Sequence, residues 1–130
     1  MKRRTPHVDL PDGIVPVYAQ IDGAKAKRSL RMALDTGASY TMAPPEKLVA
    51  AGYRIPTSQR KMIGVFTASG IEYVPVVRVS CLKSMGIAVK DIDVVCHALP
   101  AESPVEGLLG LNFLAHVPAF VEFLRKLGIA

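Results

Sequence analysis

The residue best suited to do chemistry in this chain is Asp35, which ends an apolar run and is followed at once by Thr36 and Gly37. Apolar side chains at positions 30, 32 and 34 alternate with others before it, the pattern of a half-buried strand. Thr36 can hydrogen-bond neighbouring backbone, and Gly37 permits either a close backbone approach or a positive φ. The run predicts a strand-to-loop corner that presents a carboxylate. An Asp at a strand end often only closes a turn, so the tripeptide alone leaves that interpretation open.

A carboxylate in such a corner can activate water when a second carboxyl group shares a proton with it. The ionised member then draws a proton from the water, and the protonated member donates to a carbonyl group. The sequence has no second Asp-Thr-Gly. A second copy of the chain could supply the missing acid, because an isologous two-fold interface brings identical residues together.

Two segments are expected to surround this corner. Leu108-Leu109-Gly110 reads as an apolar strand that meets a glycine and then a short helix. Met62–Thr67 and Ile71–Val76 flank the small residues Ala68, Ser69 and Gly70, and they predict a long β-hairpin whose Gly70 takes a left-handed conformation. An ordinary surface hairpin is the alternative interpretation of this second segment.

The remaining elements are mostly strands. Strands are expected at 14–21, 29–34, 74–82 and 89–96, with turns at Asp22-Gly23 and Met85-Gly86. Residues 45–52 predict a short helix with proline near its first position and Gly52 just past its end. Residues 118–128 also read as a helix, although Phe120–Phe123 would suit a strand. We divide the chain into a tail, 1–13, and one domain, 14–130.

Composition excludes several classes of protein. The chain has 130 residues, half of them hydrophobic, and a net charge of +5. The basic residues gather in a tail and a loop without aromatic interleaving, which favours a solvated surface over nucleic-acid binding. No stretch matches a secretory signal or a membrane span, so the cytoplasm is the expected compartment.

Metal and thiol chemistry are not indicated. The three histidines, His7, His97 and His116, are far apart and have no ligands at metal-binding spacing. Cys81 and Cys96 lie in apolar strands and are expected to be buried thiols rather than a disulfide. No cofactor is expected.

In order and spacing, residues 14 to 117 resemble the retropepsin-like aspartic proteases, most closely their small bacterial and retroelement-type single-domain members. The resemblance implies an all-β closed barrel with a flap hairpin and two to three short helices. It also implies a homodimeric aspartic endopeptidase that acts on extended polypeptide, with a flap at about 63–74 and Leu108-Leu109-Gly110 beneath the active-site loop.

The resemblance further assigns roles to individual residues. Asp35 would be the catalytic acid or base, Thr36 would brace the pair of subunits across the axis, and Gly37 would let its amide approach the carboxylate. The substrate-binding residues would be Ala38, Val65, Phe66, Thr67, Ala68, Ser69, Gly70 and Ile71. Of these, Val65, Phe66 and Ile71 are the expected pocket formers.

Two features depart from parts of the wider family. Ala38 stands where pepsin-like members carry a hydroxyl, which predicts a less acidic pair and an optimum of about pH 4 to 6. The helix predicted at 118–128 replaces the terminal strand that often closes retroviral-type dimers. Alternatives are a catalytically silent dimerisation or peptide-binding module of the same fold and, less favoured, a nucleic-acid-binding β domain.

Overall fold

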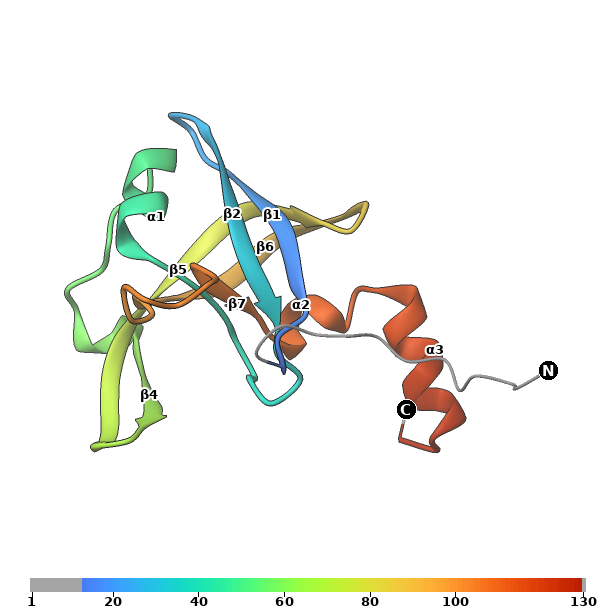
Figure 1. Cartoon of the computed structure of the whole chain (residues 1–130). Helices are drawn as coiled ribbons and strands as arrows, with labels where there is room; N and C mark the ends of the chain where they lie inside the picture. Colours follow the sequence, from blue (N-terminus) through green and yellow to red (C-terminus); the bar gives the residue numbers. More distant parts are fainter. Residues whose placement is uncertain (1–12, 130) are drawn as a thin grey trace.

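A computed structural model describes residues 13–129, and its centre is a closed β-barrel. Six strands pair around the ring in the order β1 (Pro16–Asp22), β2 (Lys27–Leu34), β7 (Gly107–Leu109), β3 (Thr41–Ala43), β6 (Ile87–Cys96) and β5 (Gly70–Ser84). Pairing of β5 with β1 closes the ring, and β4 (Met62–Thr67) adds to β5 outside it (Figure 1). The all-β barrel expected from the sequence is therefore confirmed. Of the tail predicted at 1–13, residues 1–12 lie outside the described part of the chain.

The β1–β2 hairpin delivers Asp35 to the end of the barrel. The two strands are antiparallel from the Pro16–Ala33 pair to the Asp22–Lys27 pair. Inward side chains such as Ile21 and Met32 are fully buried, which is the result expected of a strand with one face on the core. The predicted strands 14–21 and 29–34 are confirmed to within two residues at each end.

One boundary differs from the sequence-based expectation. Residues 71–76 and 74–82, expected as the end of a hairpin and a separate strand, form the single strand β5. Its first part pairs with β4 and its later part with β6. Figure 1 shows β5 running from the barrel into the projecting hairpin. Pro75 does not interrupt the strand, since proline is tolerated in a strand where its missing N–H is not needed for pairing.

The predicted helices are present. Helix α1 (Pro45–Ala51) ends at Gly52, whose φ of 111° is left-handed. A short 3₁₀ helix, η2 (Gln59–Lys61), precedes β4, and α2 (Leu111–Leu114) follows β7. The C-terminal segment is helix α3 (Pro118–Lys126), so the alternative of a strand at 120–123 is wrong.

The core lies inside the barrel and under α1 and α2. Its fully buried large side chains include Phe113, Leu30, Leu48, Leu82 and Leu109. Cys96 is buried, and burial raises the pKa of its thiol; Cys81 is half-buried, and both cysteines are free thiols. No helix within residues 13–129 is long and apolar enough to cross a membrane.

Candidate active site

Asp35 lies immediately after β2, at the corner predicted from the sequence. The backbone N–H of Gly37 donates to Asp35 Oδ1 at 2.9 Å, and the N–H of Ala38 donates to the Asp35 carbonyl oxygen at 3.2 Å. A Cβ at Gly37 would lie 3.2 Å from Oδ1. The φ of Gly37 is not among the positive values of the described glycines. Of the two reasons considered for a glycine here, the structure therefore selects the close backbone approach.

Strand β7 supports this corner from below. Leu34 pairs with Leu109 in a parallel ladder, and the Asp35 N–H donates to the Leu109 carbonyl oxygen at 2.9 Å. The Leu109 side chain is fully buried in the core. The prediction that Leu108-Leu109-Gly110 packs beneath the loop is thus confirmed.

Gly110 touches the same loop from the other side. A Cβ at Gly110 would lie 2.5 Å from the Tyr40 carbonyl oxygen and 2.7 Å from that of Ala38. The next residue, Leu111, donates its N–H to the Ala38 carbonyl oxygen at 2.8 Å. Because the obstructing atoms are backbone, any side chain at position 110 would push the loop away.

A hollow of about 460 Å³ opens between this loop and β4. Its lining includes Gly37, Ala38, Val65 and Phe66 from the predicted site. Ala68, Ser69, Gly70 and Ile71 at the hairpin tip lie outside that lining, and the side chain of Thr67 is outside the described part of the structure. Lining residues that were not among the predicted substrate-binding residues are Ser39, Tyr40, Met42, Ile63, Gly64, Val95 and Leu108. Of these, Ile63 and Gly64 belong to the predicted flap, and Leu108 to the segment predicted beneath the loop.

The tip of the hairpin projects into solvent. Phe66 is 89% exposed and Ile71 58% exposed, although both are large and apolar. The turn is closed by pairing of Thr67 with Gly70, whose φ of 124° is positive, as predicted for this glycine. Exposed apolar side chains next to a hollow are typical of a surface that meets another molecule.

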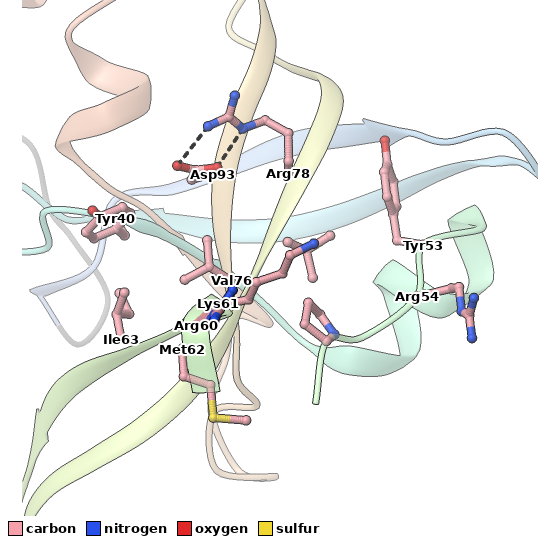
Figure 2. Close-up of a pocket in the computed structure, with 12 residues that line it drawn as sticks. Tyr40, Tyr53, Arg54, Arg60, Lys61, Met62, Ile63, Val76, Arg78 and Asp93 are labelled. Carbon is pink, nitrogen blue, oxygen red and sulfur yellow. Dashed lines mark hydrogen bonds and ion pairs between the residues drawn. The ribbon is translucent and has the colours of Figure 1, made fainter. Parts of the chain in front are cut away.

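A second hollow, of about 560 Å³, adjoins the first. Tyr40 and Ile63 line both hollows, and Figure 2 shows these two residues at one edge of the second. This second hollow is the larger one, but its lining lacks Gly37 and Ala38, the neighbours of Asp35 that line the first hollow; Asp35 itself is in neither lining. The hollow beside the Asp35 corner is therefore the better candidate for catalysis.

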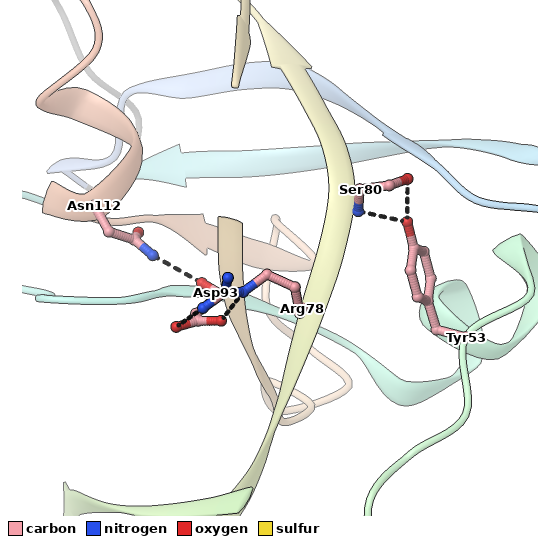
Figure 3. A network of polar contacts seen from close by, with 5 residues as sticks. All are labelled: Tyr53, Arg78, Ser80, Asp93 and Asn112. Carbon is pink, nitrogen blue, oxygen red and sulfur yellow. Dashed lines mark hydrogen bonds and ion pairs between the residues drawn. The ribbon is translucent and has the colours of Figure 1, made fainter. Parts of the chain in front are cut away.

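Asn112 is a structural residue of the site that sequence reasoning missed. Its Oδ1 accepts hydrogen bonds from the N–H and the hydroxyl of Thr41, each at 2.9 Å. Its Nδ2 donates to the Asp93 carbonyl oxygen at 2.7 Å (Figure 3). The Thr41 hydroxyl in turn accepts from the Gly110 N–H at 3.2 Å. This network connects α2 to β3 and β6 directly behind the loop. Asn112 is the chain's sole asparagine, but no local pattern predicts its partners.

The site offers one carboxylate per chain and no cluster of metal ligands. Within residues 13–129 no group of three His, Cys, Asp or Glu side chains is placed to hold a metal ion. What the arrangement offers is a carboxylate held by a backbone N–H, on a braced loop, beside a hollow bounded by a projecting hairpin.

Comparisons with known proteins agree with this geometry. A model of the family described as "gag-polyprotein putative aspartyl protease" matches residues 18–116. Among solved structures, a retropepsin-like aspartic protease from Rickettsia conorii superposes with a TM-score of 0.60 at 20% identity, covering 80% of this chain and 79% of the other. A search of curated proteins found no match. The chain therefore belongs to the aspartyl protease family of gag polyproteins, and its barrel has the retropepsin-like fold.

Proposed function

We propose that this chain is an aspartic endopeptidase that works as a homodimer, with one Asp35 from each copy. The observation that carries the proposal is the position of Asp35 in a backbone-braced corner beside the hollow under β4. Membership of an aspartyl protease family supports the same chemistry. Because each chain has a single Asp-Thr-Gly, the second carboxylate comes from the partner copy.

In this mechanism the two Asp35 side chains share one proton. The ionised carboxylate removes a proton from a water molecule, whose oxygen attacks the carbon of the scissile peptide bond. The protonated carboxyl donates its proton to the carbonyl oxygen, so a neutral tetrahedral intermediate forms. Proton transfer to the amide nitrogen then releases an amine and a carboxylic acid.

The neighbours of Asp35 have supporting roles in this proposal. Gly37 holds Asp35 Oδ1 through its N–H, which orients the carboxylate. Thr36 is exposed in the single chain, as a residue that contacts a partner copy must be before assembly. The hairpin of β4 and β5 serves as a flap, and an extended polypeptide lies between it and the loop at 37–40.

The test is cleavage of a peptide library by wild type and Asp35→Asn between about pH 3 and 7. Asparagine keeps the Oδ1 that accepts from Gly37, so the variant should fold and dimerise like wild type. We expect its activity to fall by about two to four orders of magnitude or more. Mass measurement in solution and circular dichroism of both proteins provide the control.

Two results would contradict the proposal. Equal cleavage by Asp35→Asn would assign the activity to another group or to a contaminant. A folded, dimeric wild type that binds library peptides without cleaving them would support the alternative, a peptide-binding module of the same fold.

A further inference from the structure

The second hollow has a strongly basic lining. Its walls are the loop that follows α1, η2, the start of β4, and strands β5 and β6 (Figure 2). Among the lining residues, four side chains are cationic, Arg54, Arg60, Lys61 and Arg78, and one is anionic, Asp93. The hollow therefore carries an excess of positive charge.

One of the four cations is already neutralised. Arg78 Nε lies 2.7 Å from Asp93 Oδ1, and Arg78 Nη2 donates to Oδ2 at 3.3 Å, which makes a two-pronged ion pair (Figure 2). For Arg54, Arg60 and Lys61, the structure gives no ion pair within residues 13–129. Three positive charges at one hollow are therefore left for an external anion.

The wall that carries these cations is anchored to the barrel. Tyr53 donates its hydroxyl proton to the Asp22 carbonyl oxygen. The Tyr53 hydroxyl also accepts from the Ser80 N–H at 2.9 Å (Figure 3). At the other end of the loop, Ser58 accepts from the N–H groups of Arg60 and Lys61. A wall that is already ordered loses less entropy when a ligand binds.

The basic hollow adjoins the proposed substrate cleft. Tyr40 and Ile63 line both hollows, so an extended chain that passes under the flap can run on past Ile63 to η2. Successive residues of an extended chain advance about 3.3 Å each, and a substrate longer than the cleft would therefore reach Arg60 and Lys61. Polypeptide is the occupant that this adjacency favours over a free anion.

We infer that the basic hollow binds acidic side chains of the polypeptide substrate, outside the residues that flank the scissile bond. This inference rests on the proposed function, because it takes the peptide path from the cleft. The enzyme would then prefer substrates with Asp or Glu at such outlying positions. The preference would be electrostatic and would weaken with salt, since the cations are exposed.

The experiment compares peptides that are identical except for Glu or Gln at outlying positions. The proteins are wild type, Arg60→Gln/Lys61→Gln, and a matched control, Lys27→Gln/Arg28→Gln, which removes an adjacent basic pair from exposed positions of β2. For wild type, we expect the kcat/KM of the best Glu peptide to be about three- to tenfold higher than that of its Gln counterpart, as one or two exposed ion pairs allow. The Arg60→Gln/Lys61→Gln variant should lose this preference for Glu over Gln, and the Lys27→Gln/Arg28→Gln control should keep it.

Binding to catalytically blocked protein separates this inference from the proposed function. The same peptides, fluorescently labelled, are titrated against Asp35→Asn with and without the two hollow substitutions, at low and high salt. Tighter binding of Glu peptides than of Gln peptides, if it depends on Arg60 and Lys61, supports the inference about the basic hollow even when no cleavage is found. Equal affinity for Glu and Gln peptides, or an equal loss in the Lys27/Arg28 control, overturns it. Stronger competition by a single-stranded oligonucleotide than by the Glu peptide would also overturn it, because the hollow would then be a nucleic-acid surface.

Discussion

Replacement of Asn112 by alanine should destabilise the protein, because three hydrogen bonds behind the active-site loop would be lost. A hydrogen bond of this kind contributes about 1 kcal/mol net, so the expected loss in the free energy of unfolding is about 3 kcal/mol. Thr41 is fully buried, and its N–H would be left without its carboxamide partner. The estimate therefore holds unless water enters the space.

Urea denaturation followed by circular dichroism measures this loss. With a slope of about 2 kcal/mol/M for a domain of this size, the midpoint should fall by about 1.5 M. Asn112→Asp keeps the Oδ1 acceptor for Thr41 but loses the donor to the Asp93 carbonyl oxygen, so an intermediate loss is expected. Gln59→Ala removes an exposed amide and is the control, with a change below about 0.5 kcal/mol. Protomer concentration is kept constant, since a dimer's stability depends on it.

The reasoning would be refuted by an Asn112→Ala midpoint within about 0.3 M of wild type at an unchanged slope, a shift of about 0.6 kcal/mol. That result would mean that solvent or a shifted backbone replaces all three bonds. An equally large loss in the free energy of unfolding for Gln59→Ala would show that the measurement does not isolate the hydrogen bonds of Asn112.

Two further predictions concern Gly110 and the stability of the protein at acid pH. Gly110→Ala should lower the free energy of unfolding by about 1 to 3 kcal/mol, near the upper end because the new Cβ would meet backbone atoms. Gly64→Ala should lower it less, because its Cβ would meet only side chains. Equal urea midpoints for the two variants would contradict this prediction. Hydrogen bonds from Gln20 and then Lys83 lower the pKa of Asp22. Its contribution to stability is therefore full above the unfolded-state pKa of about 3.9 and is lost as pH falls from there through the lowered folded-state pKa. Asp22→Asn should slightly reduce the fall in the free energy of unfolding at acid pH; the effect is small because the Asp22–Lys83 ion pair is partly exposed. An unchanged dependence of this free energy on pH below about pH 4 would rule the contribution out.

Several parts of the fold were predictable because their signals are local. Alternation of apolar residues places a strand before Asp35, and proline and glycine bound α1 at its two ends. Small residues before Gly70 predict a tight turn, which is where β4 meets β5. In α3 the helical spacing of apolar residues outweighed the short strand-like run within it.

Other parts depend on contacts that no local pattern encodes. The boundary within β5 was wrong because a strand can change partners along its length without a break in the sequence pattern. The residues that line the cleft come from four separate parts of the chain, 37–42, 63–66, Val95 and Leu108. Met42 and Val95 were therefore missed, and Leu108 was predicted only as support beneath the loop. The pairing of Arg78 with Asp93, which leaves other cations at the basic hollow unpaired, depends on the register between β5 and β6.

The sequence by itself determined where the carboxylate stands and what it follows, since strand periodicity and the Thr-Gly corner are properties of adjacent residues. The tertiary structure alone decided what holds that corner in place. The Asp35 N–H is held by the Leu109 carbonyl oxygen, and Thr41 is held by Asn112 across a separation of 71 residues. Such contacts form only when the barrel closes, because the burial of the core sets the register in which distant strands meet.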